Sequence, residues 1–240
     1  MVGTSLLGFI AWSTSMTARQ FDPEFQQLPS EIPIFPLPNA LLLPGGQLPM
    51  NIFEPRYMAM VNYALATPTR LIGMVQPVDS TSPTPDNGNA VPDLFQIGCA
   101  GRIAAFQESD DGRFIIALSG VNRFRLAGDA MHKDGFRLAT VDWQEFDHDL
   151  RIDVSHFDRR PLITVMKRYF DMKGFETDWT QIEKSDNQAL LATLSMVCPF
   201  AVAEKQALLE ADTLSHRADL LIAMMEMALH EETGERDARH

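Results

Sequence analysis

Cysteine is scarce in this chain of 240 residues, which contains only Cys99 and Cys198. The two lie far apart, with no C-x-x-C pair and no histidine at metal-ligand spacing beside either. This arrangement excludes a zinc-finger pattern and a framework of disulfides. We expect two buried thiols in a reducing compartment.

The chain also lacks an apolar run long enough to cross a membrane. The apolar stretch at residues 6–12 is short and no lysine or arginine precedes it, so it does not match a secretory signal peptide. We interpret it as the result of a start codon assigned too early, with Met16 as the alternative start to Met1. The protein is expected to be soluble and cytoplasmic.

Positive charge is in short supply, because 20 Lys and Arg stand against 32 Asp and Glu, which gives a net charge of −12. This excess of acid argues against a general polyanion partner. Motifs for catalysis are missing as well: the sequence has no G-x-x-x-x-G-K-[ST] phosphate loop, no G-x-S-x-G and no H-E-x-x-H. We therefore predict no enzymatic activity, no cofactor and no metal. The cluster Asp147-His148-Asp149 is the nearest to a metal group, and a solvated linker is the favoured interpretation.

The most informative stretch is Ile34–Tyr57, I-F-P-L-P-N-A-L-L-L-P-G-G-Q-L-P-M-N-I-F-E-P-R-Y. Its prolines have no N–H and cannot occupy central positions of a sheet. Apolar strand segments remain at 41–43 and 48–53, joined by a tight turn at 44–46. Pro55 suits the first position of a helix. The apolar stripe of that helix is Tyr57, Met60, Val61, Ala64 and Leu65.

Further short strands are expected after this helix, at 71–75, 95–106, 114–119 and 137–143, and residues 120–125 are expected to lead into another strand. Asp111-Gly112 is a typical hairpin turn, and the glycines in 95–106 predict a bulge or the close approach of another backbone. Residues 77–92 are rich in Pro, Ser and Thr and read as a mobile surface loop. Short strands with tight turns favour a small, partly open barrel over a parallel sheet.

The apolar period changes to that of helices from Pro161 onward. We expect a helix ended by Gly174, a second at 189–197 with a capping box from Ser185 and Gln188, and a third at 202–210. Asp212 or Thr213 would cap a long final helix. The predicted organisation is a lead-in at 1–30, a barrel at 31–145 and a helical bundle at 155–232.

Ordered motifs along the chain carry a resemblance to a known family. F-P-L-P, L-L-P-G-G-x-L-P-M and I-F-E-P-R-Y are followed by I-G-C-A-G-R-I at 97–103, G-V-N-R-F at 120–124 and K-Q-A-L-L-E at 205–210. Over residues 31–230 the chain resembles the N-terminal substrate-recognition domain of the Lon protease. The resemblance implies an α+β fold, a PUA-like partly open barrel with one early helix followed by a C-terminal helical bundle. Gly101 departs from it, because the family more often has a larger residue there, and so does the loop at 77–92.

The resemblance implies a polypeptide-recognition module that lacks the ATPase and the Ser–Lys peptidase of full-length Lon. It would bind unfolded or degron-bearing polypeptides, as an adaptor or modulator of ATP-dependent proteolysis, with a protease or chaperone as a further partner. The candidate binding residues are Pro44, Met50, Phe53, Glu54, Arg56 and Tyr57. A structural explanation competes at two of them: Glu54 can accept from free N–H groups of the first helical turn, and Arg56 can pair with a carboxylate beneath the loop.

Two other functions compete with this hypothesis. PUA-like barrels often bind RNA, and the candidate phosphate contacts are Arg102, Arg113, Arg123 and Arg125, although the excess of acid makes nucleic acid an unfavourable partner. A small-molecule enzyme or ligand sensor is the third possibility, and no motif marks its pocket.

Overall fold

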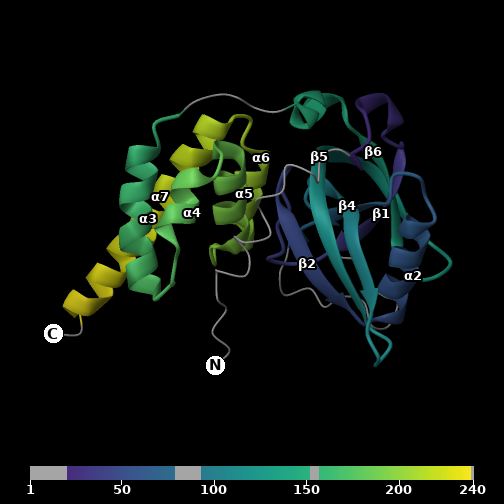
Figure 1. The fold of residues 1–240 in the computed structure, drawn as a ribbon, viewed down its shortest axis with the longest axis horizontal. Helices are drawn as coiled ribbons and strands as arrows, with labels where there is room; N and C mark the ends of the chain where they lie inside the picture. Colours follow the sequence, from purple (N-terminus) through teal and green to yellow (C-terminus); the bar gives the residue numbers. More distant parts are fainter. Residues whose placement is uncertain (1–20, 79–92, 152–156, 239–240) are drawn as a thin grey trace.

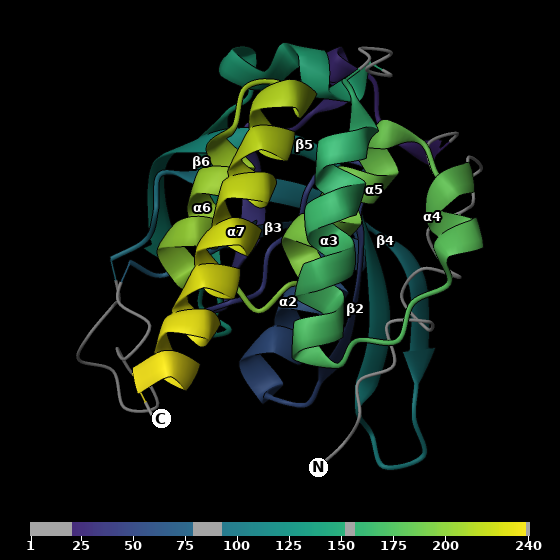
Figure 2. The same ribbon diagram turned by 90° about the vertical axis from the view of Figure 1, so that its left-hand side faces the viewer.

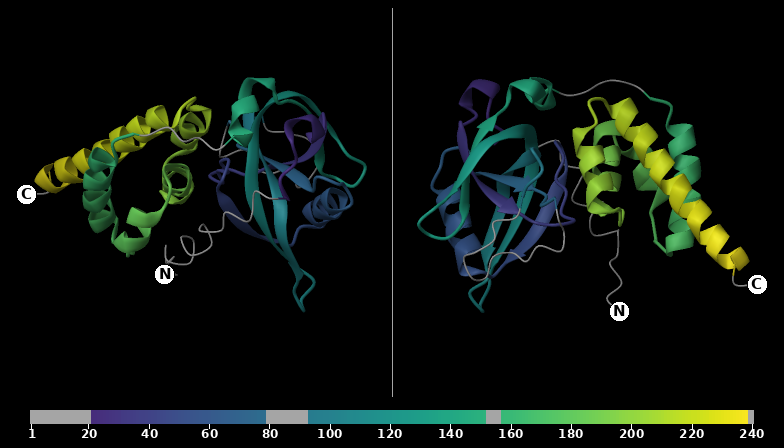
Figure 3. Two further views of the ribbon diagram at one scale, coloured as in Figure 1. Left: turned by 45° about the horizontal axis from the view of Figure 1, so that its top comes forward. Right: turned by 180° about the vertical axis from the view of Figure 1, so that it is seen from behind.

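The computed structural model describes residues 21–78, 93–151 and 157–238, and shows a β-rich half beside a helical half (Figure 1). The first twenty residues, with both candidate starts, and nearly all of the loop predicted at 77–92 lie outside the described residues. Figure 3 gives two further views in which the same two halves stand next to each other.

Six strands form one sheet in the order β2-β5-β4-β3-β1-β6, and an additional pairing between β5 and β6 closes it into a ring. The first part of β5 pairs with β2 and β4, and its last part pairs with β6. The irregular ring of strands confirms the predicted α+β class. The strands are β1 (Glu31–Pro36), β2 (Gln47–Ile52), β3 (Leu71–Val75), β4 (Ile97–Glu108), β5 (Phe114–Met131) and β6 (Arg137–Asp142).

The prediction that residues 120–125 lead into a strand separate from 114–119 is wrong, because β5 runs through Gly120 without a turn. Gly120 serves a close approach: a Cβ added there would lie 2.0 Å from the Leu43 carbonyl oxygen. Two hydrogen bonds join Gly45 and Gly46 to Gly120: Gly45 N–H donates to the Gly120 carbonyl (2.9 Å), and Gly120 N–H donates to the Gly46 carbonyl (2.8 Å).

The predicted strand at 41–43 is also wrong, since these three leucines have no strand pairing although all are buried. They cross the sheet as an irregular segment held against Gly120. Leu42 explains the departure at Gly101, where an added Cβ would lie 2.6 Å from the Leu42 Cδ2 atom. Leu42 therefore occupies the space that a side chain at position 101 would need. The pairing of β4 with β5 also shifts register between Ala100 and Gly101, which is the bulge that the glycines of this strand predicted.

Helix α2 (Pro55–Leu65) begins at Pro55 as predicted and packs against β1 and β3. Four of the five residues of its predicted stripe are buried, and Leu65 is partly buried. The ring of Tyr57 lies against Phe35 with centroids 4.1 Å apart, and burial raises the pKa of the Tyr57 hydroxyl. This contact fixes the start of α2 to the sheet.

The helical half contains five helices among the described residues, and α3 and α7 run side by side (Figure 2). Gly174 ends α3 with φ of 67°, as predicted. The capping box of Ser185 is wrong: Asp186 caps α5, and its carboxylate accepts from Ala189 N–H at 2.7 Å. Thr213 Oγ1 accepts from His216 N–H at the start of α7. The helices are α3 (Arg159–Lys173), α4 (Trp179–Lys184), α5 (Asn187–Val197), α6 (Val202–Glu210) and α7 (Leu214–Ala238).

Helix α6 joins the two halves through buried polar side chains. Lys205 Nζ donates to the Asn39 carbonyl at 2.8 Å, and burial lowers the pKa of its ammonium group. Gln206 Nε2 donates to the Ile97 carbonyl at 3.1 Å, and Gln206 Oε1 accepts from Gln76 Nε2 at 3.1 Å. The K-Q pair of the sequence motif at 205–210 therefore connects α6 to the sheet.

A second connection comes from the short 3-10 helix η3 (Gln144–Leu150), which contains Asp147-His148-Asp149. The interpretation of this cluster as a solvated linker is wrong for Asp149, which is buried and accepts hydrogen bonds from Nε and Nη2 of Arg123, each at 2.8 Å. The Arg123 guanidinium also donates to the carbonyls of Leu209 and Ala211, at 3.0 and 2.8 Å. One arginine thus holds β5, η3 and the end of α6 together.

Candidate polypeptide-binding surface

Strand β2 lies at the edge of the sheet, at the left margin of the strands in Figure 1, and among the described residues it pairs with β5 alone. Pro49 stands opposite Ala117 in this pairing. A proline has no N–H to donate to β5, so the backbone of Pro49 faces away from that strand. The residues on either side, Leu48 and Met50, make the hydrogen bonds to β5. The backbone groups of Gln47, Pro49 and Asn51 therefore point to the open side.

Apolar side chains cover the outer face of this edge. Pro49 and Asn51 share one face because side chains alternate along a strand, and Ile115 stands opposite Asn51 on that face. Phe53 follows directly after Ile52, the last residue of β2. Phe53 is 63% exposed and Ile115 46% exposed. We name Pro49, Asn51, Phe53 and Ile115 the β2 edge surface.

A charged pair borders this surface where β2 passes into α2. Arg56 Nη2 lies 2.6 Å from Glu54 Oε2, and the guanidinium lies 4.7 Å from the centroid of the Tyr57 ring. The structural explanation from the sequence is wrong for Glu54, whose side chain makes no capping hydrogen bond although its carbonyl accepts from Tyr57 and Met58 N–H. Arg56 does pair with a carboxylate, that of Glu54.

The structure separates the six residues that the sequence put forward. Phe53, Glu54 and Arg56 reach solvent beside one another. Met50 is partly buried against the core, on the opposite face of β2, and Tyr57 is buried beneath Arg56. Pro44 is buried and faces the helical half, where its carbonyl accepts from Gln188 Nε2 at 3.4 Å.

Sequence reasoning missed three members of the surface: Pro49, Asn51 and Ile115. Ile115 lies in the apolar run F-I-I-A-L at 114–118, and such a run does not indicate which side chain faces outward. The available signal was Pro49, because a proline inside a strand marks an edge. Pairing that edge with the exposed position of β5 needs the register, which only the fold supplies.

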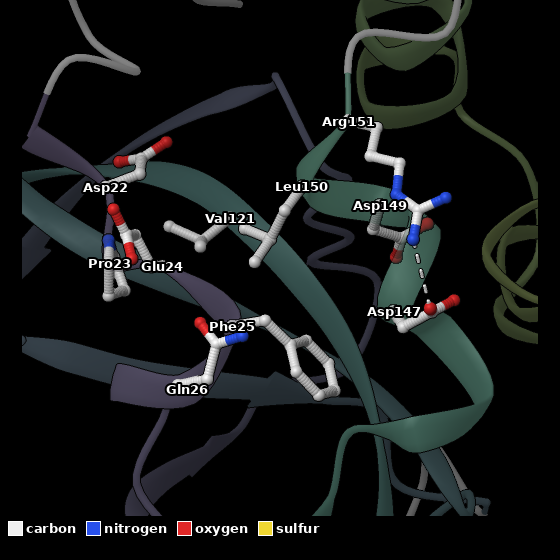
Figure 4. A pocket seen from close by; sticks show the side chains of 10 residues that line it. All are labelled: Asp22, Pro23, Glu24, Phe25, Gln26, Val121, Asp147, Asp149, Leu150 and Arg151. Atoms are coloured by element: carbon white, nitrogen blue, oxygen red, sulfur yellow. Dashed lines mark hydrogen bonds and ion pairs between the residues drawn. The ribbon is translucent and has the colours of Figure 1, made fainter.

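A cavity of about 560 Å³ lies between the lead-in and η3, and Figure 4 shows its lining side chains. Three of its carboxylates are bound by arginines: Asp22 by Arg102 at 2.9 Å, Asp149 by Arg123, and Asp147 by Arg151 at 3.3 Å. These ion pairs give the three carboxylates a structural role. The cavity is lined by Asp22, Pro23, Glu24, Phe25, Gln26, Val121, Asp147, Asp149, Leu150 and Arg151.

The four arginines considered for RNA all pair with carboxylates. Arg102 and Arg123 do so in poorly exposed positions, as described above. At the surface, Arg113 pairs with Asp111 at 2.9 Å, and Arg125 pairs with Glu145 at 2.7 Å. A phosphate would have to compete with these carboxylates, which weighs against an RNA interface at these four arginines.

The part of the chain that the structure describes contains neither a membrane-spanning helix nor a cluster of metal ligands. No helix there is long and apolar enough to span a bilayer. No group of three or more His, Cys, Asp or Glu side chains in that part could hold a metal ion. Both cysteines are buried, and burial raises the pKa of the Cys198 thiol to about 12.

Comparison with known proteins gives relatives of one kind. The chain is 24% identical over 204 residues to Lon protease of Escherichia coli (strain K12), covering 82% of this chain and 24% of that protein. It is 25% identical over 233 residues to Lon protease of Cytophaga hutchinsonii, covering 94% of this chain and 27% of that protein. The chain therefore spans about a quarter of the length of these relatives.

Solved structures show the same fold. The Lon N-terminal domain protein from Xanthomonas campestris superposes with a TM-score of 0.57 at 24% identity, covering 81% of this chain and 98% of that chain. The N-terminal domain of the Mycobacterium avium complex Lon protease gives a TM-score of 0.57 at 15% identity, covering 82% and 98%. Residues 31–227 match the family described as the ATP-dependent protease La (LON) substrate-binding domain. Because this match spans most of the chain, the protein belongs to that substrate-binding domain family.

Proposed function

We propose that this protein binds unfolded or degron-bearing polypeptides through the β2 edge surface. The observation that carries the proposal is the exposure of two large apolar side chains, Phe53 directly after the free edge strand β2 and Ile115 on its neighbour β5, in a member of a substrate-binding family. Exposed apolar side chains that adjoin one another are typical of surfaces that contact other polypeptides. The Glu54–Arg56 pair at the border offers polar contacts to the bound chain.

We further propose that the bound polypeptide is destined for ATP-dependent proteolysis, with this protein as an adaptor or modulator. Support comes from the family description and from relatives named Lon protease. In this role the protein contributes recognition, and the peptide bond is cleaved elsewhere.

Fluorescence anisotropy of a labelled, permanently unfolded polypeptide, titrated with the protein beside labelled RNA at low and moderate salt, tests the proposal. Phe53→Ser should weaken polypeptide binding, since burying the exposed part of a phenylalanine contributes about 1–2 kcal/mol. Phe21→Ser is the matched control, because Phe21 is 72% exposed but lies on the lead-in, outside the β2 edge surface. Equal losses in both variants, or binding of RNA in place of polypeptide, would contradict the proposed function.

A further inference from the structure

We propose that the bound polypeptide adds to the sheet as an extended strand, antiparallel to β2 along its open edge. This inference rests on the proposed function and specifies how the polypeptide is held and which segments are preferred. The proposal concerns backbone hydrogen bonds at Gln47, Pro49 and Asn51, together with the apolar side chains that surround them.

The open edge offers a defined set of backbone groups. Gln47 and Asn51 each present an N–H and a carbonyl, whereas Pro49 presents a carbonyl alone. An incoming strand that pairs with these residues can donate hydrogen bonds to all three carbonyls. Its own carbonyl opposite Pro49 receives no hydrogen bond, because proline has no N–H. An antiparallel addition continues the pairing that β2 already makes with β5, so the twist of the sheet needs no change.

Side-chain alternation then defines the class of segment. In an antiparallel pair, the residues that exchange hydrogen bonds with Pro49 and Asn51 carry their side chains on the same face as these two. That face contains Ile115, and Phe53 follows directly after the strand, so apolar side chains are favoured at every second position of the incoming strand. Segments with strand-like alternation should therefore bind better than segments with helical periodicity.

Charge adds a second preference at one end of the edge. The end of β2 lies against the start of β5 and hence beside the hairpin between β4 and β5. The carboxylates around this end outnumber the guanidinium groups of Arg56 and Arg113, and the whole chain is acidic. A segment flanked by lysine or arginine is therefore complementary to this end. The carboxylates belong to Glu54, Glu108, Asp110 and Asp111.

A second copy of this chain is a poorer occupant than such a segment. Two β2 edges facing each other would each lack the donor at Pro49, and both carry the same acidic surroundings. Proline at an edge strand and like charge both oppose edge-to-edge pairing. The geometry therefore favours a cationic, extended client over self-association.

The experiment uses the full chain and a labelled peptide with leucine at every second position, serine between and lysine at both ends. Two backbone N-methylated forms are compared, one methylated at the leucines and one at the serines. Antiparallel addition places the leucine N–H groups toward β2, so methylation at the leucines should weaken binding tenfold or more. Methylation at the serines should change it less than twofold. Equal effects of both forms, or a loss only on serine methylation, would overturn the inference.

Variants of the protein provide the complementary test. Asn51→Pro removes an edge N–H that β5 does not use, so it should weaken peptide binding about tenfold while the fold is retained, as checked by thermal unfolding. Asn51→Ala is the matched control: it keeps the edge N–H and removes the side chain alone, so it should lose clearly less affinity than Asn51→Pro. Binding of unfolded polypeptide without any effect of Asn51→Pro or of N-methylation refutes strand addition and leaves the proposed function standing. If neither the unfolded polypeptide nor the peptide binds, strand addition and the proposed function are both refuted. If the protein forms a dimer in sedimentation experiments and Asn51→Pro abolishes that dimer, the edge is assigned to a second copy of the chain.

Discussion

Replacement of Arg123 by methionine should destabilise the protein by about 3–5 kcal/mol, because the buried Asp149 carboxylate loses its guanidinium partner and keeps only the hydrogen bond from the backbone N–H of residue 123. Arg123 is 2% exposed, and its guanidinium binds Asp149 through two hydrogen bonds of 2.8 Å. It also donates to the carbonyls of Leu209 and Ala211, which methionine cannot do. Methionine fills much of the same volume, so the effect reports lost polar contacts more than a cavity.

Chemical denaturation followed by circular dichroism measures this effect as a shift of the midpoint at constant slope. Arg125→Met is the matched control on the same strand. The ion pair of Arg125 with Glu145 is exposed, so this substitution should lower the free energy of unfolding by only about 0–1 kcal/mol. In an Asp149→Asn background the effect of Arg123→Met should fall, because the residue left behind is neutral. A loss below about 1 kcal/mol, or an equal loss in both backgrounds, would refute the assigned role of this pair.

Two further predictions concern the backbone of β5 and the start of α3. Gly120→Ala should cost at least about 2 kcal/mol in the free energy of unfolding, since its Cβ would meet the Leu43 carbonyl, whereas Gly128→Ala, with no atom within 4 Å, should be nearly neutral. Asp158 caps α3, and hydrogen bonds from Arg160 lower its carboxyl pKa from 3.8 to about 2. Its stabilising contribution is therefore present above pH 4 and lost as the pH falls toward 2, so Asp158→Asn should be less stable than the parent at pH 5 and equally stable near pH 2. Carboxyl titration by NMR checks the pKa directly, and an ordinary value for Asp158 would refute the assignment.

Local chemistry made part of this fold predictable from the sequence. The helix beginning at Pro55, the strand at 71–75 and the helix end at Gly174 each follow from neighbouring residues. Such signals depend on backbone preferences within a few residues, and a single sequence contains them in full.

What could not be predicted depends on contacts between distant residues. The leucines at 41–43 read as a strand because nothing nearby shows that Gly120 will receive their backbone. Asp149 read as solvated because its partner Arg123 comes from another element. The candidate surface divides in the same way: Phe53 and its charged neighbours follow from the strand–helix junction, while Ile115 joins them through the register of β2 and β5.

The pairing of β2 with β5 has a consequence for folding during synthesis. The ladder partner of β2 begins at Phe114, so β2 leaves the ribosome well before its partner exists. At roughly 5–20 residues per second, this interval of about 60 residues lasts about 3–12 seconds. During that time the apolar stretch around Phe53 is unfolded and exposed. For these seconds the nascent chain is itself an unfolded polypeptide of the kind that the folded protein is proposed to bind.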